Sequence, residues 1–402
     1  MSSRRIVFVC HTAAGESLRS AHAIAKLDDV ELLRVSDVHD TQQLIAAARA
    51  FGRLDKIVTA QETLLLPVAE ANEALGLEAM SSETVKRTLD KSQLKATLKQ
   101  AGIKTPRDQI ITTAEEAQSF ASEVGFPIVI KPVDGSGALT TFEIRNEEQL
   151  AQVLQLIQPP VIAEAFILGQ ELCFDTITIN NEPQFYSLCK YNPPIIEALQ
   201  NPETQWRCIM PEQIDDKYQE FIAQGLAVVR ALQVGNAMTH MEGFVNGGFI
   251  DATLRPAGAR IAPMFGFACD VDPYRVWARV AVDGCFDGPL ERKYAVGTIF
   301  LRGIGSGLVE HVAGVDTVCE ELGASLVEAH WPRVGASKSP TYTGDGFITV
   351  RHADIGVVDE ALDQIDRTVK ITYTSLKPDP PVLSERLRNY KSLTTPAWEA
   401  TL

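Results

Sequence analysis

The sequence has no apolar run long enough to cross a membrane. A spanning helix needs about 20 consecutive apolar residues, whereas the run after Arg5, residues 6–10, ends after five residues at His11. A secretion signal also requires a longer apolar segment, so we reject that interpretation of the N-terminus. We therefore expect a cytoplasmic protein without a membrane partner.

Positive charge and paired cysteines are also scarce. The chain has 37 Lys and Arg against 52 Asp and Glu, a net charge of −15, and this excess of negative charge argues against nucleic acid as a partner. The seven cysteines are odd in number and include no C-x-x-C motif, so we expect buried thiols in a reducing compartment and no disulfide framework. A ligand that carries phosphate would need a local basic pocket.

The chain does have the length and apolar content of a protein with two or three domains. It contains 402 residues, of which 45% are hydrophobic and 22% charged, as is typical of globular proteins. Strand-like and helix-like segments alternate near the N-terminus, which predicts a small α/β domain over residues 1–85. Residues 193–215 contain several prolines and no clear periodicity, so we expect an irregular segment there. Beyond residue 292, Gly-rich β-type segments predominate, with a single helix over residues 357–369.

Two lysines and a Gly-rich turn form the first candidate site. Lys91 lies at the start of a helix-like segment, and Lys131 ends the strand-like stretch FPIVIKP. The turn DGSG follows, and its small residues Gly135, Ser136 and Gly137 allow backbone N–H groups to approach phosphate oxygens closely. Each feature alone is more typical of a solvated surface lysine or an ordinary β-turn. A flexible ammonium group at a strand end before such a turn suits a polyphosphate.

A β-hairpin with two opposed carboxylates forms the second candidate site. The stretch HMEGFVNGGFIDATLR spans residues 240–255. A two-residue turn at its Asn-Gly pair would place Glu242 opposite Asp251 on the neighbouring strand. Like charges in that arrangement destabilise a sheet unless a cation lies between them, and Mg²⁺ prefers carboxylates together with substrate phosphates. The alternative is an acidic pair in solvent.

Taken in order, these motifs resemble the ATP-grasp fold over residues 86–295. The resemblance includes a third segment, EAFILGQE, which runs from Glu164 to Glu171 and is similar to the hinge of that fold. It implies an α/β protein of the α+β ATP-grasp type, with a small domain ahead of a two-lobed nucleotide-binding domain. The implied domains are residues 1–85, residues 86–292, a β-rich ligase subdomain over residues 293–376, and a tail over residues 377–402.

The ATP-grasp resemblance also implies ligands for these motifs. The residues implied to bind ATP are Lys91, Lys131, Gly135, Ser136, Gly137, Glu164, Ala165, Phe166, Ile167 and Glu171. Among them, the lysines and the turn would contact the phosphates, and the hinge would line the adenine slot. Glu171 would bind the ribose, because a carboxylate accepts two hydrogen bonds from a vicinal diol. Glu242 and Asp251 would hold Mg²⁺, or Mn²⁺.

The substrate side of the hairpin is most similar to the bacterial L-amino acid ligases. The motifs HME and RPAG carry this likeness, which implies that His240, Arg255 and Gly258 line an amino-acid pocket. Arg255 would stabilise an acyl phosphate and the oxyanion formed when an amine attacks it. The chain departs from the family at Asp251, where many ligases have Glu, and at Thr253, where they have an Asn metal ligand.

Lys190 is a further catalytic candidate. If Asn180 and Asn181 form a tight turn, Lys190 lies opposite Glu171 on the neighbouring strand. It would then either form a cross-strand salt bridge or point at the phosphates of the nucleotide.

The resemblance implies an ATP- and Mg²⁺-dependent ligase that forms an amide bond between two amino acids through an acyl phosphate and releases ADP and phosphate. Its partners would be small-molecule substrates, and a homodimer is compatible with the family. Three alternatives stay open: a ligase for a non-standard carboxylic acid, a phosphotransferase or carboxylase, and a catalytically impaired ATP-binding protein. The sequence does not name the amino acids, although the segment around Trp206 is a candidate lining for their pocket.

Overall fold

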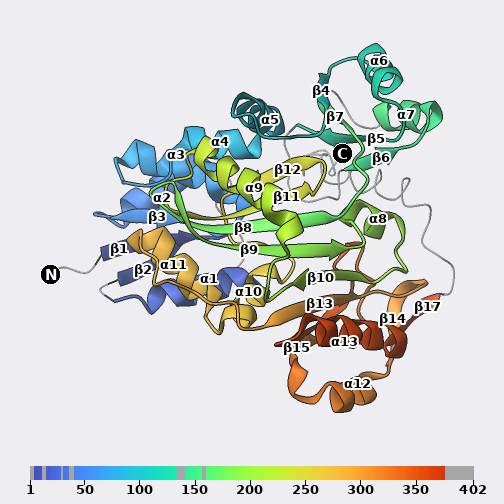
Figure 1. The fold of residues 1–402 in the computed structure, drawn as a ribbon. Coiled ribbons are helices and arrows are strands. Elements are labelled where there is room, and N and C mark those ends of the chain that lie inside the picture. The colour runs from blue at the N-terminus through green and yellow to red at the C-terminus, as the bar shows by residue number, and fades with distance from the viewer. Residues whose placement is uncertain are drawn as a thin grey trace, which may run out of the picture.

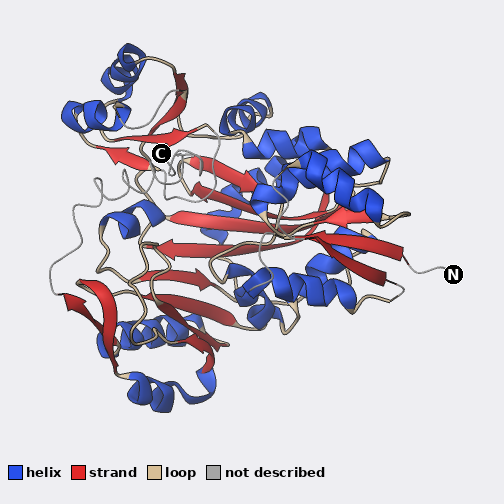
Figure 2. Cartoon of the chain, turned by 180° about the vertical axis from the view of Figure 1, so that it is seen from behind, coloured by secondary structure: helices blue, strands red, loops and turns tan. Residues whose placement is uncertain are grey.

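The computed structural model describes residues 4–10, 15–28, 30–35, 40–133, 141–155 and 160–375. Within these ranges the chain forms an N-terminal α/β unit, a small four-stranded sheet and a large eight-stranded sheet (Figure 1). Helices lie beside all three sheets, as the view from behind also shows (Figure 2). This mixed arrangement confirms the predicted α/β fold class. No helix in the described ranges is both long and apolar enough to cross a membrane.

The N-terminal unit is a parallel sheet with the strand order β2-β1-β3. Residues 7–9 of its central strand are fully buried, because helices cover both faces of a parallel sheet. The predicted alternation of strands and helices is confirmed. The elements are β1 (Arg4–Val9), α1 (Gly15–Ala25), β2 (Val30–Val35), α2 (Thr41–Ala50), β3 (Lys56–Val58), η1 (Glu62–Leu64) and α3 (Leu65–Leu75).

Two consecutive helices, α4 (Ser82–Leu89) and α5 (Lys91–Gln100), connect this unit to the small sheet. Asp90 lies between them, and its carboxylate accepts hydrogen bonds from two backbone N–H groups in the first turn of α5. Such a cap satisfies donors that have no partner inside the helix. It fixes Lys91 as the first residue of α5.

The small sheet is antiparallel and has the strand order β4-β7-β5-β6. Two helices pack against it and share a core that includes Phe120 and Phe142. Thr113 and Glu116 form a capping box at the start of the first helix. The elements are β4 (Asp108–Ile111), α6 (Ala114–Val124), β5 (Ile128–Pro132), β6 (Phe142–Ile144), α7 (Glu147–Leu154) and β7 (Val161–Ala165).

The large sheet is antiparallel and has the strand order β12-β11-β8-β9-β10-β13-β16-β15. Side chains alternate between its faces, so Leu172 and Phe174 pack with α9 while Cys173 faces the opposite side, which α10 and α11 partly cover. Because β10 pairs with β13, the sheet continues across residue 292. The elements are β8 (Glu171–Ile179), β9 (Glu182–Asn192), β10 (Trp206–Met210), η3 (Asp216–Tyr218), α9 (Gln219–Leu232), β11 (Ala237–Phe244), β12 (Gly248–Thr253), α10 (Ile261–Cys269), α11 (Pro273–Ala278), η4 (Arg279–Asp283), β13 (Ala295–Leu301), β15 (Leu326–His330) and β16 (Gly346–His352).

A two-stranded sheet and two helices complete the described chain. The prediction of a single helix in this region is wrong, because α12 forms as well as α13. α12 has only eight residues and buries only Val318 and Leu322, so its periodic signal in the sequence is short. The elements are β14 (Ser306–Ala313), α12 (Val315–Leu322), η5 (Gly323–Ser325), α13 (Ile355–Thr368) and β17 (Lys370–Ser375).

The prediction of an irregular segment over residues 193–215 is also wrong. The segment contains α8 (Ile195–Gln200) and the strand β10. β10 has hydrogen-bonded neighbours on both sides, β9 and β13, so long-range pairing stabilises a strand of five residues. A strand this short leaves little periodicity to read in the sequence.

All seven cysteines are free thiols, as predicted. Five of them are buried, but the prediction of burial is wrong for Cys285 and Cys319, which are exposed. Cys319 faces solvent because α12 presents only its apolar stripe to the core. The buried thiols are Cys10, Cys173, Cys189, Cys208 and Cys269.

Candidate functional site

One cavity is lined by residues of both the small and the large sheet and collects most of the predicted site residues. Gly135, Ser136 and Gly137 lie outside the described residues. Lys190 is not among the residues that line the cavity. The predicted residues in its wall are Lys91, Lys131, Glu164, Ala165, Phe166, Ile167, Glu171, His240, Glu242, Asp251, Arg255 and Gly258.

One face of the large sheet forms the floor of this cavity. Asp251 on β12 pairs with Glu242 on β11, which in turn pairs with Cys173 on β8. Glu171 and His240 lie two residues along their strands from Cys173 and Glu242, and therefore on the same face. The period of two in each strand thus presents the polar residues to one side and the apolar residues to α9.

The predicted pairing of Glu242 with Asp251 is confirmed, although the turn differs from the prediction. The hairpin closes at Phe244 and Gly248, which leaves a three-residue loop in place of a two-residue turn. A β-bulge at Ile250 then inserts one extra residue and restores the pairing. The two departures compensate each other, so both carboxylates lie on the cavity side.

Glu242 lies close enough to Glu171 to disfavour the charged form of Glu171. Burial, followed by the nearby Glu242, raises the pKa of Glu171 well above its usual value. The hydroxyl oxygen of Thr253 is buried and has no hydrogen-bond partner within the described part of the chain. Glu242 and Asp251 supply the carboxylate oxygens that Mg²⁺ prefers, and Thr253 adds an oxygen beside them. This donor set fits a magnesium ion.

Lys91 lies beside these carboxylates. Its Nζ is 3.4 Å from Oδ2 of Asp251. Burial lowers the pKa of Lys91, but Asp251, Glu62 and Glu164 together outweigh this effect and leave its pKa raised. The ammonium group is therefore charged and positioned at the wall of the cavity, as a phosphate-binding lysine would have to be.

Glu164 is held by two lysines in the interior. Its carboxylate oxygens lie 2.9 Å from Nζ of Lys131 and 3.1 Å from Nζ of Lys95. Burial opposes the charge of Glu164, but the two cations lower its pKa to about 2. Burial also lowers the pKa of Lys95, which shares this one carboxylate with Lys131. The sequence reasoning missed Lys95, although its spacing of four residues from Lys91 on α5 could have indicated it.

His240 is oriented by a carboxylate on the next strand. Its Nδ1 lies 2.7 Å from Oδ1 of Asp175, and its Nε2 lies 3.5 Å from Oε1 of Glu242. Burial lowers the pKa of His240, but Asp175, with Cys173 and Glu242, raises it overall to well above the usual value. Asp175 was not a predicted site residue, and only the strand pairing of β8 with β11 identifies it.

Arg255 is paired with Glu62, a residue of η1 in the N-terminal unit. The guanidinium nitrogens lie 2.5 and 2.9 Å from Oε2 of Glu62. Both side chains line the cavity, so the N-terminal unit contributes directly to the site. The sequence contains no signal for this pair, because its members are 193 positions apart.

The predicted position of Lys190 opposite Glu171 is wrong. A β-bulge near the turn between β8 and β9 leaves Gln184 without a partner and shifts the register by one residue, so Lys190 pairs with Leu172. A shift of one residue turns a side chain to the other face of a sheet. Tyr191 takes the position on the cavity side, and its hydroxyl donates a hydrogen bond of 3.0 Å to Glu242.

Residues 88–225 match the family model of the ATP-grasp domain. This part of the chain is an ATP-grasp domain. It contains the hinge and both predicted phosphate lysines, whereas the hairpin and Arg255 follow it. The crystal structure of an L-amino acid ligase from Bacillus licheniformis has the same fold, with a TM-score of 0.74 at 18% identity over 93% of this chain and 100% of that chain.

Two curated proteins that are similar to this chain are named as ligases of amino acids. The L-arginine-specific L-amino acid ligase of Bacillus subtilis is 26% identical over 217 residues, which cover 52% of each chain. The alanine–anticapsin ligase of Bacillus subtilis strain 168 is 28% identical over 144 residues, which cover 32% of this chain and 30% of that one. The matched region thus spans about half the length of the first relative and less than a third of the second.

Proposed function

We propose that the protein is an ATP-dependent ligase that joins the carboxylate of one amino acid to the amine of another through an acyl phosphate. One observation carries the proposal: the seven predicted nucleotide residues that the structure describes, the opposed carboxylates and Arg255 line the same cavity. The similarity to two bacterial ligases of amino acids supports it. Arg255 and Glu62 add a charged pair to the wall of this cavity, which a simple nucleotide-binding protein would not need.

In this proposal the nucleotide lies between the two sheets. Lys91 and Lys131 bind its phosphates, and Glu171 accepts hydrogen bonds from its ribose. Lys91 pairs with Asp251, so a polyphosphate that attracts this ammonium would leave Asp251 available to a cation. Mg²⁺, when bound by Glu242 and Asp251, neutralises charge on the phosphates.

The reaction has two steps. The carboxylate of the first amino acid attacks the γ-phosphorus of ATP, the bond from that phosphorus to the bridging oxygen breaks, and ADP leaves. The amine of the second amino acid attacks the acyl carbon of the resulting acyl phosphate, loses a proton, and displaces phosphate to form the amide. Arg255, held by Glu62, donates hydrogen bonds to the acyl phosphate and then to the oxyanion. The protein contributes mainly position and charge.

Incubation with ATP, Mg²⁺ and amino acids, singly and in pairs, tests this function. We expect phosphate release only when two amino acids are present, together with a dipeptide that mass spectrometry detects. Release with one carboxylic acid and no amino-acid partner would instead support a different carboxylate ligase. Nucleotide binding without any turnover across the twenty amino acids and their pairs would support an impaired ATP-binding protein and contradict the proposal.

A further inference from the structure

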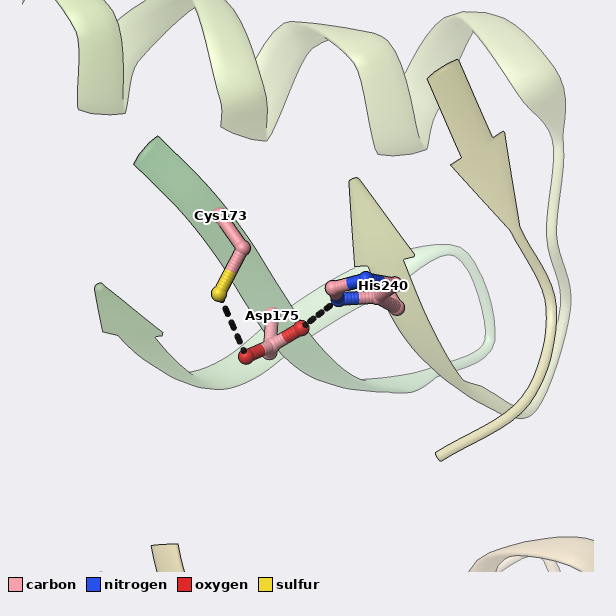
Figure 3. Close-up of side chains that lie close together, drawn as sticks. All are labelled: Cys173, Asp175 and His240. Atoms are coloured by element: carbon pink, nitrogen blue, oxygen red, sulfur yellow. Dashed lines mark hydrogen bonds and ion pairs between the residues drawn. The ribbon is translucent and has the colours of Figure 1, made fainter. Parts of the chain in front are cut away.

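A cluster of three side chains lies behind the carboxylates of the floor. Cys173 and Asp175 lie two residues apart on β8, and His240 pairs with Asp175 from β11, so all three occupy one face of the sheet (Figure 3). Nδ1 of His240 is 2.7 Å from Oδ1 of Asp175, and Sγ of Cys173 is 3.5 Å from Oδ2 of the same residue. The proposed ligase reaction has no use for the thiol.

The donor atoms of the cluster are close enough together to share one metal ion. One donor atom from each residue lies within 4.8 Å of the other two. Zinc bonds of about 2.0–2.3 Å place neighbouring donor atoms roughly 3.5 Å apart, so small side-chain rotations would close the three around an ion. A water molecule from the cavity would complete the coordination.

We infer that Cys173, Asp175 and His240 form a binding site for a thiophilic divalent cation such as Zn²⁺ or Co²⁺. A sulfur and an imidazole select such ions over Mg²⁺, which prefers oxygen ligands. Cys173 is fully buried, but His240 lines the cavity, so an ion reaches the cluster from the cavity. The site is distinct from the oxygen ligands Glu242 and Asp251.

The two metal sites are neighbours on the sheet. Glu242 pairs with Cys173 across β11 and β8 and lies 3.5 Å from Nε2 of His240. An ion in the cluster would add positive charge beside Glu242 and would occupy the imidazole. If the proposed ligase function is correct, micromolar Zn²⁺ therefore inhibits turnover, and Cys173→Ser relieves the inhibition.

Cobalt binding tests the site without any assay of activity. We expect Co²⁺, added to the full-length reduced protein without nucleotide, to produce a sulfur-to-cobalt charge-transfer band that saturates at one ion per chain and that Zn²⁺ abolishes. Cys173→Ser loses the band and weakens Co²⁺ binding more than about a hundredfold, because even the partners of metal ligands are worth tenfold to a hundredfold. Cys285→Ser removes an exposed thiol and retains the band.

Asp175→Asn keeps the thiol and the shape of the side chain, and it also weakens Co²⁺ binding, so the site stays testable if Cys173→Ser does not fold. Absence of the band in the wild-type protein would overturn the inference, as would its persistence in folded Cys173→Ser. Phosphate release by the same preparations, assayed with ATP, Mg²⁺ and amino acids but without cobalt, separates this outcome from the ligase proposal. An inactive protein that binds cobalt contradicts only the ligase function, and an active one without the band contradicts only the metal site.

Discussion

At the scale of single residues, the proposed mechanism assigns Arg255 to amide formation and not to nucleotide binding. Arg255 lies in the cavity but is held by Glu62 and not by any of the predicted nucleotide residues. In the proposed mechanism Arg255 contacts only the acyl phosphate and the oxyanion, so its removal is expected to destabilise the transition state and not the bound nucleotide.

We expect Arg255→Ala to lower the rate of phosphate release by about 10²–10³, the usual cost of losing one oxyanion donor. The affinity for ATP, measured by calorimetry, stays close to that of the wild type. Arg230→Ala is the control, because among the described residues the side chain of Arg230 pairs with Glu182 alone, in an exposed ion pair. Such pairs contribute little. Wild-type turnover in Arg255→Ala would contradict the role assigned to this side chain.

Tyr191 and Lys190 are adjacent in sequence but lie on opposite faces of β9. Tyr191→Phe removes the hydrogen bond to Glu242, which is worth about 1 kcal/mol, so we expect the half-saturating Mg²⁺ concentration for phosphate release to rise about fivefold. Lys190→Ala leaves this concentration within about twofold of the wild-type value, since Lys190 is not in the cavity wall. The opposite pattern would mean that the register of β8 and β9 is not the one relevant to function.

At the scale of elements, the hairpin of β11 and β12 depends on Gly248. Its φ of 77° lies in the left-handed region, and a Cβ there would lie 2.0 Å from the carbonyl oxygen of Lys104. That carbonyl also accepts a hydrogen bond from the backbone N–H of Phe249, so the chain cannot withdraw it freely. A side chain at this position would therefore displace the strand that carries Asp251.

We expect Gly248→Ala to reduce the free energy of unfolding by more than about 3 kcal/mol, because strain and overpacking add. Gly76→Ala is the matched control, since Gly76 has a φ of 67° with no heavy atom within 4 Å of the added Cβ. Gly76→Ala should lose only the unfolding free energy that a side chain costs in the left-handed region, about 1–2 kcal/mol. Urea denaturation measures both, and equal losses would mean that Lys104 moves away at no cost.

The two hairpins of the floor show what the sequence predicts and what it does not. The pairing of Glu242 with Asp251 follows from turn residues and alternation, and the extra residue at Ile250 does not disturb it because the loop is one residue longer. Between β8 and β9 the bulge at Gln184 has no such compensation, so the same reasoning assigned Lys190 to the wrong face. A bulge has no strong sequence signal, yet it turns every following side chain over.

The missed site residues share a different cause. The phosphate lysines and the hinge are local motifs, and the match to the ATP-grasp domain over residues 88–225 supports the fold that they implied. Glu62 joins the site only because the N-terminal unit packs against the segment after β12. Lys95 joins it because α5 lies against both β7 and β12. Contacts of this kind depend on tertiary packing, which periodicity in one segment does not report.

At the scale of the whole molecule, Glu164 ties the small sheet to the large one. Its partner Lys95 also donates a hydrogen bond to the carbonyl oxygen of Phe249 on β12. The lysine is fully buried, so loss of the carboxylate would leave a charge without compensation in the interior. Removing one partner of a buried pair costs roughly 3–5 kcal/mol.

We expect Glu164→Gln to show this loss of unfolding free energy at pH 7. The folded-state pKa of Glu164 is lowered from 4.5 to about 2, so its contribution is fully present above pH 4.5 and disappears as the pH falls through about 2. The difference between wild type and variant in urea denaturation should therefore shrink between these values. Glu83→Gln, in an exposed pair with Arg87, should change little, and a difference independent of pH would contradict the assignment.

The continuity of the large sheet limits how the chain can be divided. One of the two hydrogen-bonded neighbours of β10 is β13, which lies beyond residue 292. Trp206 on β10 stacks on Phe300 of that strand. A fragment that stops at residue 292 would lose Tyr342 from the cavity wall. It would also expose a row of backbone donors and acceptors on β10 and uncover the side chain of Trp206. Exposed strand edges of this kind pair with other chains and aggregate. For expression and screening, the chain should therefore extend well past residue 292 and include β13.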